Sequence, residues 1–115
     1  DAEVRRAAAH GLLQFAHQDR KLIKQVALRL LNDPDPRVRL EVAPALLGAD
    51  ESLGKAALAA LEPFLSGSEP SLRVSALQAL GKATHVRYSA QVLPHLDDLS
   101  DEVRLAAALS LESLC

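Results

Sequence analysis

A short pattern recurs four times along the chain: an apolar residue is followed directly by arginine, and an acidic or small polar residue stands three positions before the apolar residue. The four segments are DAEVR at 1–5, DPRVR at 35–39, EPSLR at 69–73 and SDEVR at 100–104. Their apolar anchors are 34, 34 and 31 residues apart and are Val4, Val38, Leu72 and Val103. Intervals of this size are typical of solenoids, in which each repeat is one supersecondary unit that packs on its neighbours.

Residues with helical spacing follow each anchor, and we refer to these four stretches as the first helices. Leucine stands eight residues past every anchor, so that it shares one side of a helix with the anchor. The residues seven past the anchors are all small and are Gly11, Ala45, Ala79 and Ser110. Because the distance between packed helices depends on the side chains at the contact, we expect a neighbouring helix to approach closely there.

Capping residues mark the boundaries of the first helices. Pro36 and Pro70 suit a first helical position, where a missing amide hydrogen does no harm. Gly48 and Gly81 are predicted to end two of the helices as C-terminal caps. Side chains three residues before the anchors can accept the free amide hydrogens of a helix start; they are Asp1, Asp35, Glu69 and Ser100.

A second helix is expected in the first three repeats, at residues 20–32, 53–65 and 87–98, whereas the fourth repeat lacks its partner helix. Pro63 and Pro94 each fall nine residues before an anchor. Because proline donates no amide hydrogen and crowds the preceding turn, we expect both prolines to bend their helices.

Composition agrees with a helical chain. Apolar residues make up 49% of the sequence but aromatic residues only 3%, which favours packed helices over sheets. We predict an all-α fold, a right-handed alpha-alpha superhelix (alpha-solenoid) of about three and a half helical hairpins. The chain is expected to be a single domain excised from a longer protein, with repeat units at about 1–33, 34–67, 68–98 and 99–115.

The sequence resembles the HEAT-repeat family, in which an acidic cap and a Val-Arg pair enter the first helix and a Leu-x-Pro-x-Leu-like segment ends the second. LEPFL at 61–65 and VLPHL at 92–96 match that ending. The resemblance implies a ladder of polar contacts between repeats, each made by the cap and the arginine four residues later. The implied pairs are Asp1 with Arg5, Asp35 with Arg39, and Glu69 with Arg73. Arg104 belongs to the fourth rung, which has Ser100 at its cap and is expected to be weaker.

No residue set for catalysis or metal binding is found in the sequence. None of the four histidines has another His or Cys three or four residues away, as a helical metal site requires. HEAT-like deoxyhypusine hydroxylases bind iron through His-Glu dipeptides, which this chain lacks. His95 aligns with core positions of the earlier second helices and is interpreted as a half-buried packing residue. We predict no enzyme activity, no cofactor and no metal.

Nucleic acid and membrane insertion are not expected. Basic and acidic residues are nearly balanced, 13 against 15, so there is no broad positive field for a phosphate backbone. HEAT-like alkylpurine DNA glycosylases use a basic concave face and aromatic side chains, and this chain has neither. No apolar run approaches the roughly 20 residues of a membrane span. The single cysteine, Cys115, fits a reducing compartment, and we expect a cytoplasmic protein.

The outward face of the second helices is the predicted site for a protein or peptide partner, because in HEAT-like solenoids these helices line the concave surface. The helical wheel places Leu28 within a polar arc, where it could anchor an acidic helix or extended peptide. The alternative is a solvated basic face with one exposed leucine. The candidate binding residues are Lys21, Lys24, Gln25, Leu28, Arg29, Lys55 and Glu62.

Two other functions stay open at this point. The segment could be a structural or regulatory spacer in a larger protein, such as a transporter or signalling protein with appended HEAT repeats. It could also be the non-catalytic part of a HEAT-like bilin lyase. Terminal repeats without polar caps leave apolar helix faces exposed, so we expect the isolated fragment to associate end to end.

Overall fold

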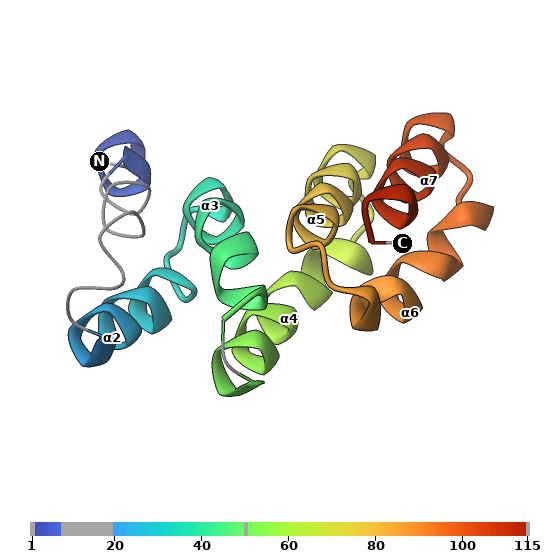
Figure 1. The fold of residues 1–115 in the computed structure, drawn as a ribbon. Coiled ribbons are helices and arrows are strands. Elements are labelled where there is room, and N and C mark those ends of the chain that lie inside the picture. The colour runs from blue at the N-terminus through green and yellow to red at the C-terminus, as the bar shows by residue number, and fades with distance from the viewer. Residues whose placement is uncertain (1, 8–19, 50, 115) are drawn as a thin grey trace. The chain divides into compact units, whose positions relative to one another are not determined.

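The computed structural model describes residues 2–7, 20–49 and 51–114, and at residues 20–23 the backbone alone. Residues 2–7 are helical, and no strand occurs in the described part of the chain. The other elements, labelled in Figure 1, are α2 (Arg20–Leu30), α3 (Pro36–Leu47), α4 (Glu51–Leu65), α5 (Pro70–Lys82), η1 (Val86–Tyr88), α6 (Ser89–Val92), η2 (Leu93–Asp97) and α7 (Asp101–Leu114). The predicted all-α, solenoid-type fold is confirmed, while its right-handed turn stays a prediction.

Two compact units make up the structure, Asp1–Ala60 and Leu61–Cys115, so that their boundary lies within α4. We describe each unit by itself. The single-domain organisation and the four repeat boundaries remain predictions. Several residues that the sequence singled out lie outside the described residues, namely Asp1, His10, Gly11, His17 and Cys115.

The predicted starts of the first helices are observed in α3 and α5. Asp35 is the N-cap of α3, and its carboxylate accepts a hydrogen bond from the main-chain amide of Arg37 at 2.8 Å. Pro36 and Pro70 begin the two helices, where no intrahelical partner exists for an amide hydrogen. Glu69 occupies the N-cap of α5, although its side chain makes no capping bond.

The predicted ends are right for one helix and wrong for the other. Gly48 is the C-cap of α3. Gly81, in contrast, lies inside α5 and is buried, and the residue with a left-handed backbone is Thr84, with φ of 51°. The reason is packing: a Cβ at position 81 would lie 3.1 Å from the Cα of Ser110 on α7. Gly81 therefore serves the close approach of two helices rather than a helix end.

Each unit has its own leucine-, alanine- and valine-rich core. The anchors Val38 of the first unit and Val103 of the second are fully buried, whereas Leu72 is half-buried and Val4 is 66% exposed. Two of the four anchors therefore lie in the cores.

Of the small positions seven past the anchors, Ala79 and Ser110 are buried but Ala45 is exposed. Among the described residues no helix therefore packs closely on Ala45, contrary to the prediction.

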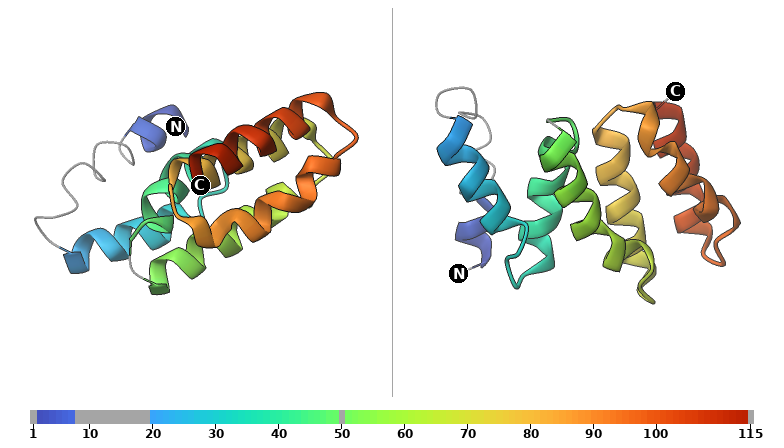
Figure 2. Two further views of the ribbon diagram at one scale, coloured as in Figure 1. Left: turned by 45° about the vertical axis from the view of Figure 1, so that its right-hand side comes forward. Right: turned by 90° about the horizontal axis from the view of Figure 1, so that it is seen from below.

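The second helices are continuous in the first two repeats and interrupted in the third. α2 and α4 match the predicted 20–32 and 53–65, and Pro63 falls in the last turn of α4. The predicted helix 87–98 is instead η1, a single turn of α6, and η2. Pro94 is at the start of η2, and because proline cannot donate the bond that would continue α6, the chain tightens into a 3₁₀ turn. Figure 2 shows this stepped path beside α7.

Candidate functional site

A largely buried ion pair joins the two repeats of the second unit. Arg73 on α5 donates to both carboxylate oxygens of Asp98, from Nε at 3.0 Å and from Nη2 at 3.2 Å, and its Nη1 donates to the carbonyl of Gly67 at 2.8 Å. The same carboxylate accepts from the amide of Ser100 at 2.9 Å, and the carbonyl of Asp98 accepts from Arg104 at 2.6 Å. Asp98 therefore links α5 to the start of α7.

The first unit repeats this arrangement. Arg5 donates to Asp33 from Nε at 2.7 Å and from Nη2 at 3.2 Å, and Asp33 accepts from the amide of Asp35 at 2.9 Å. Arg37 adds a bridge between Asp35 and Glu3. In both units an arginine of one first helix is thus fixed to the linker that precedes the next first helix.

The acidic partner of these arginines differs from the prediction. The family resemblance predicts a pair between Arg73 and the cap Glu69, but the carboxylate that Arg73 contacts lies in the following linker. The Asp35 carboxylate, predicted for Arg39, accepts instead from the amide and guanidinium of Arg37. A cap side chain turns toward the amides of its own helix start, so it does not bridge repeats here. The rung of Arg39 stays a prediction.

A recurrence in the sequence could have identified the observed partners. Asp33 and Asp98 each stand five residues before an anchor, and Gly67 stands at the same place before the third anchor. This position is acidic in only two of the three linkers. It is therefore a weaker signal in the sequence than the apolar-Arg pair, which recurs in all four repeats.

The ladder carboxylates make stability depend on pH at the acid end. Hydrogen bonds from the Ser100 amide and then from Arg73 lower the pKa of Asp98, and those from Arg5 and then from the Asp35 amide lower the pKa of Asp33. At low pH the unfolded chain therefore binds more protons than the folded chain, so the free energy of unfolding falls as protons are added.

We expect the urea midpoint to stay level above about pH 5 and to drop as pH falls below about 4, through the lowered pKa values of the folded chain. An Asp98→Asn variant should have a lower urea midpoint at neutral pH, and that midpoint should fall less than the wild-type midpoint as the pH is lowered. A wild-type midpoint that is unchanged down to about pH 3 would contradict this assignment.

Along α2, Leu28 lies between polar and cationic residues. Lys24 and Leu28 are half-buried, while Gln25 and Arg29 are exposed. Residues four apart on a helix are neighbours, so Lys24 flanks Leu28 on one side and Arg29 follows it directly. Only the backbone of Lys21 is described. The structure thus places four of the predicted binding residues on one short helix.

Lys55, the predicted residue on α4 of the same unit, is exposed and lies 3.5 Å from the carboxylate of Glu51, one turn earlier. Such an exposed pair contributes little to stability, and it leaves the lysine able to exchange partners. In the second unit Glu62 is exposed on α4, and Leu93 is an exposed apolar residue of η2.

His95 is half-buried, as predicted, and its Nδ1 lies 3.8 Å from Oδ2 of Asp98. His85 caps η1 by accepting from the amide of Arg87 at 3.5 Å. Across the part of the chain that the structure describes, no three His, Cys, Asp or Glu side chains come together to hold a metal ion.

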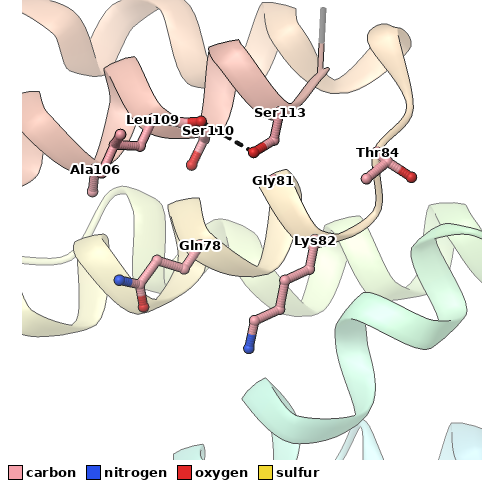
Figure 3. A pocket seen from close by; sticks show the side chains of 8 residues that line it. All are labelled: Gln78, Gly81, Lys82, Thr84, Ala106, Leu109, Ser110 and Ser113. Carbon is pink, nitrogen blue, oxygen red and sulfur yellow. Dashed lines mark hydrogen bonds between the residues drawn. The ribbon is translucent and has the colours of Figure 1, made fainter.

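A shallow groove of about 510 Å³ runs between α5 and α7 (Figure 3). Its hydroxyl groups already donate to main-chain carbonyls: Ser110 to Leu77 at 2.7 Å, Ser113 to Leu109 at 3.2 Å, and Thr84 to Ala83 at 2.8 Å. Figure 3 shows Lys82 extending away from α7. The groove therefore offers no converging acid, base or nucleophile. Its other lining residues are Gln78, Gly81, Ala106 and Leu109.

Repeated helical hairpins and arginine–aspartate rungs between repeats define a helical-repeat protein of the alpha-solenoid class. The model of HEAT repeats matches residues 1–80 and residues 28–112, and the chain belongs to the HEAT-repeat family. A search of curated proteins gives no match. HEAT repeats are commonly scaffolds for protein interactions and are generally not catalytic. No helix among the described segments is long and apolar enough to cross a membrane.

Proposed function

We propose that this chain is a non-enzymatic scaffold that binds a protein or peptide through the outward face of its second helices. The observation that carries the proposal is on α2, where the half-buried Leu28 has Lys24 and Gln25 one turn before it and the exposed Arg29 directly after it. An apolar contact enclosed by charged groups is a common basis of peptide recognition, because the rim excludes water from the contact.

The chemistry of the face favours an acidic amphipathic partner. Lys24 and Arg29 supply positive charge on both sides of Leu28, and the apolar side chain of a bound helix or extended segment would cover the leucine. The mixed charges of α4, with Lys55 and Glu62 exposed, favour recognition by shape and individual contacts over a single broad charge field.

A double variant on α2 tests the proposal. We expect Lys24→Glu with Leu28→Asp to weaken capture of the specific partner from an extract of the source cells by at least about tenfold, because it reverses the charge and removes the apolar contact. The affinity of the identified partner is then measured by titration. Circular dichroism and urea unfolding establish that the variant remains folded.

The matched control carries the same two chemical changes away from the second-helix face. Lys82→Glu lies on α5, and Leu99→Asp lies in the linker before α7. If the control loses the partner as strongly as the α2 variant, the site is not on α2. If neither the parent chain nor the α2 variant retains a specific partner, the spacer function is favoured instead, and a bound pigment would favour the bilin lyase alternative.

A further inference from the structure

The second-helix segment of the third repeat presents three exposed apolar side chains in a row. Val86 of η1 is 61% exposed and Leu93 of η2 is 52% exposed, and Ala90 of α6 between them is exposed as well. They are spaced four and three residues apart, so they share one side of a helical path, and the buried residues Tyr88 and Val92 fall on the other side. We refer to Val86, Ala90 and Leu93 as the apolar stripe.

The same positions are exposed in a repeat that has another repeat after it. The stripe residues stand 17, 13 and 10 positions before the anchor Val103, and their counterparts before the anchor Leu72 are Lys55, Ala59 and Glu62 of α4. All three counterparts are exposed, although the third repeat follows α4 in the chain. A following repeat therefore does not cover these positions, and they belong to the solvent-facing side of the second helices.

In the third repeat this side is apolar at all three positions. The second repeat has lysine, alanine and glutamate there, and the first repeat has Lys21, Gln25 and Leu28. Single exposed apolar residues are ordinary on a protein surface, whereas contiguous ones often mark a binding surface. The third repeat therefore offers an apolar contact where the second repeat offers a mixed, charged one.

Opposite charges stand at the two ends of the stripe. At its start, the guanidinium carbon of the exposed Arg87 lies 5.1 Å from the centroid of the Tyr88 ring, and Nη2 donates to the phenol oxygen at 3.2 Å. Tyr88 is buried, so these contacts hold the guanidinium in place, and a neutral phenol does not cancel its charge. At the other end, the exposed Asp97 stands four residues after Leu93.

The sequence around the start of the stripe is free of acidic residues. No Asp or Glu occurs between residues 70 and 96, so no acidic residue near Arg87 in the sequence offsets its charge. Complementary charges on a partner suppress wrong partners and fix the register of a contact. A partner of this stripe therefore needs an acidic group at one end of its apolar contact and a basic group at the other.

We propose that the apolar stripe binds one amphipathic helix of a partner protein, with an acidic residue over Arg87 and a basic residue over Asp97. Val86 and Leu93 are seven residues apart, about 10–14 Å along a helical path, so two turns of a partner helix with apolar residues at i, i+3 or i+4, and i+7 cover the stripe. The inference rests on the proposed function, because it assigns residues and partner chemistry to the same side of the second helices.

Synthetic helices of about 15 residues are the probes, because shorter helices are marginal in water. All share one leucine face; the Glu–Lys probe has glutamates at one end and lysines at the other, and the Lys–Lys probe has lysines at both ends. Fluorescence anisotropy should show that the parent chain binds the Glu–Lys probe about fivefold more tightly than the Lys–Lys probe. The double variant Val86→Asp, Leu93→Asp should bind the Glu–Lys probe at least about tenfold more weakly.

A charge reversal at either end of the stripe should switch the preference. Arg87→Glu makes both ends of the stripe acidic, so this variant should bind the Lys–Lys probe more tightly than the Glu–Lys probe. Asp97→Lys makes both ends basic and should favour a probe with glutamates at both ends. Variants that keep the preference of the parent chain would overturn the assignment of the partner's charges.

Leu99→Asp is the control, because Leu99 is 99% exposed in the linker and lies outside the stripe. It should bind the Glu–Lys probe like the parent chain, and urea unfolding should show that every variant is folded. The α2 variant Lys24→Glu, Leu28→Asp separates the two proposals. If it loses the probe while the stripe variant keeps it, the inference is wrong and the proposed function stands. A parent chain that binds no probe overturns the inference, and the capture experiment on α2 then decides the proposed function by itself.

Discussion

Asp98→Ala should lower the free energy of unfolding by about 3 kcal/mol, because it leaves a largely buried guanidinium without its carboxylate. The substitution removes two hydrogen bonds from Arg73 and the bond that Asp98 accepts from the Ser100 amide. Urea denaturation followed by circular dichroism measures the loss as a fall in the midpoint with little change in slope.

Asp97→Ala is the control for this prediction, because Asp97 is exposed and precedes Asp98 directly. Its midpoint should stay close to that of the parent, as is usual for surface substitutions. Asp33→Ala should cost less than Asp98→Ala, since Arg5 is more exposed than Arg73. Equal losses at positions 97 and 98 would indicate that general charge, rather than the rung, is responsible.

The local features of the fold could be predicted because they depend on residues close in sequence. Asp35 and Pro36 mark the start of α3 through capping that involves only the next two residues, and the Val-Arg recurrence gives the repeat interval. The periodic apolar pattern also places α2 and α4 correctly. Helical propensity and capping are local physics, so one sequence is sufficient to derive them.

The contacts between repeats could not be predicted in the same way. The sequence pattern pairs Arg73 with Glu69, four residues earlier, whereas its observed partner, Asp98, depends on the path of the linker after η2. The sequence predicts a helix end at Gly81 because glycine often ends helices, although its role depends on Ser110, 29 positions away in the sequence. Such contacts are tertiary, and sequence spacing alone does not distinguish them.

The candidate binding face could be predicted only in part. Its position on α2 follows from the helical wheel, but the degree of exposure does not. Leu28 is half-buried rather than fully exposed, whereas Leu93, its counterpart in the third repeat, is exposed. The interruption at Pro94 does not explain the difference, because Glu62, the counterpart in the continuous helix α4, is exposed as well.

Gly81→Leu should be at least as damaging as the loss of Asp98, at about 3 kcal/mol or more, because overpacking at a helix contact forces the two backbones apart. The first added carbon would lie 3.1 Å from both Cα and Oγ of Ser110. The Cα cannot move without moving α7, so the hydrogen bond from Ser110 to the Leu77 carbonyl should also weaken.

Lys82→Leu separates this effect from helix propensity, because Lys82 is the next residue of α5 and is exposed. Leucine has a higher helix propensity than glycine, by somewhat less than about 1 kcal/mol, so without the Ser110 contact Gly81→Leu would stabilise the chain. We expect the urea midpoint to fall strongly for Gly81→Leu and to change little for Lys82→Leu. A rise in the midpoint of Gly81→Leu would mean that α5 and α7 can separate at little energetic cost, and that their close approach does not hold the second unit together.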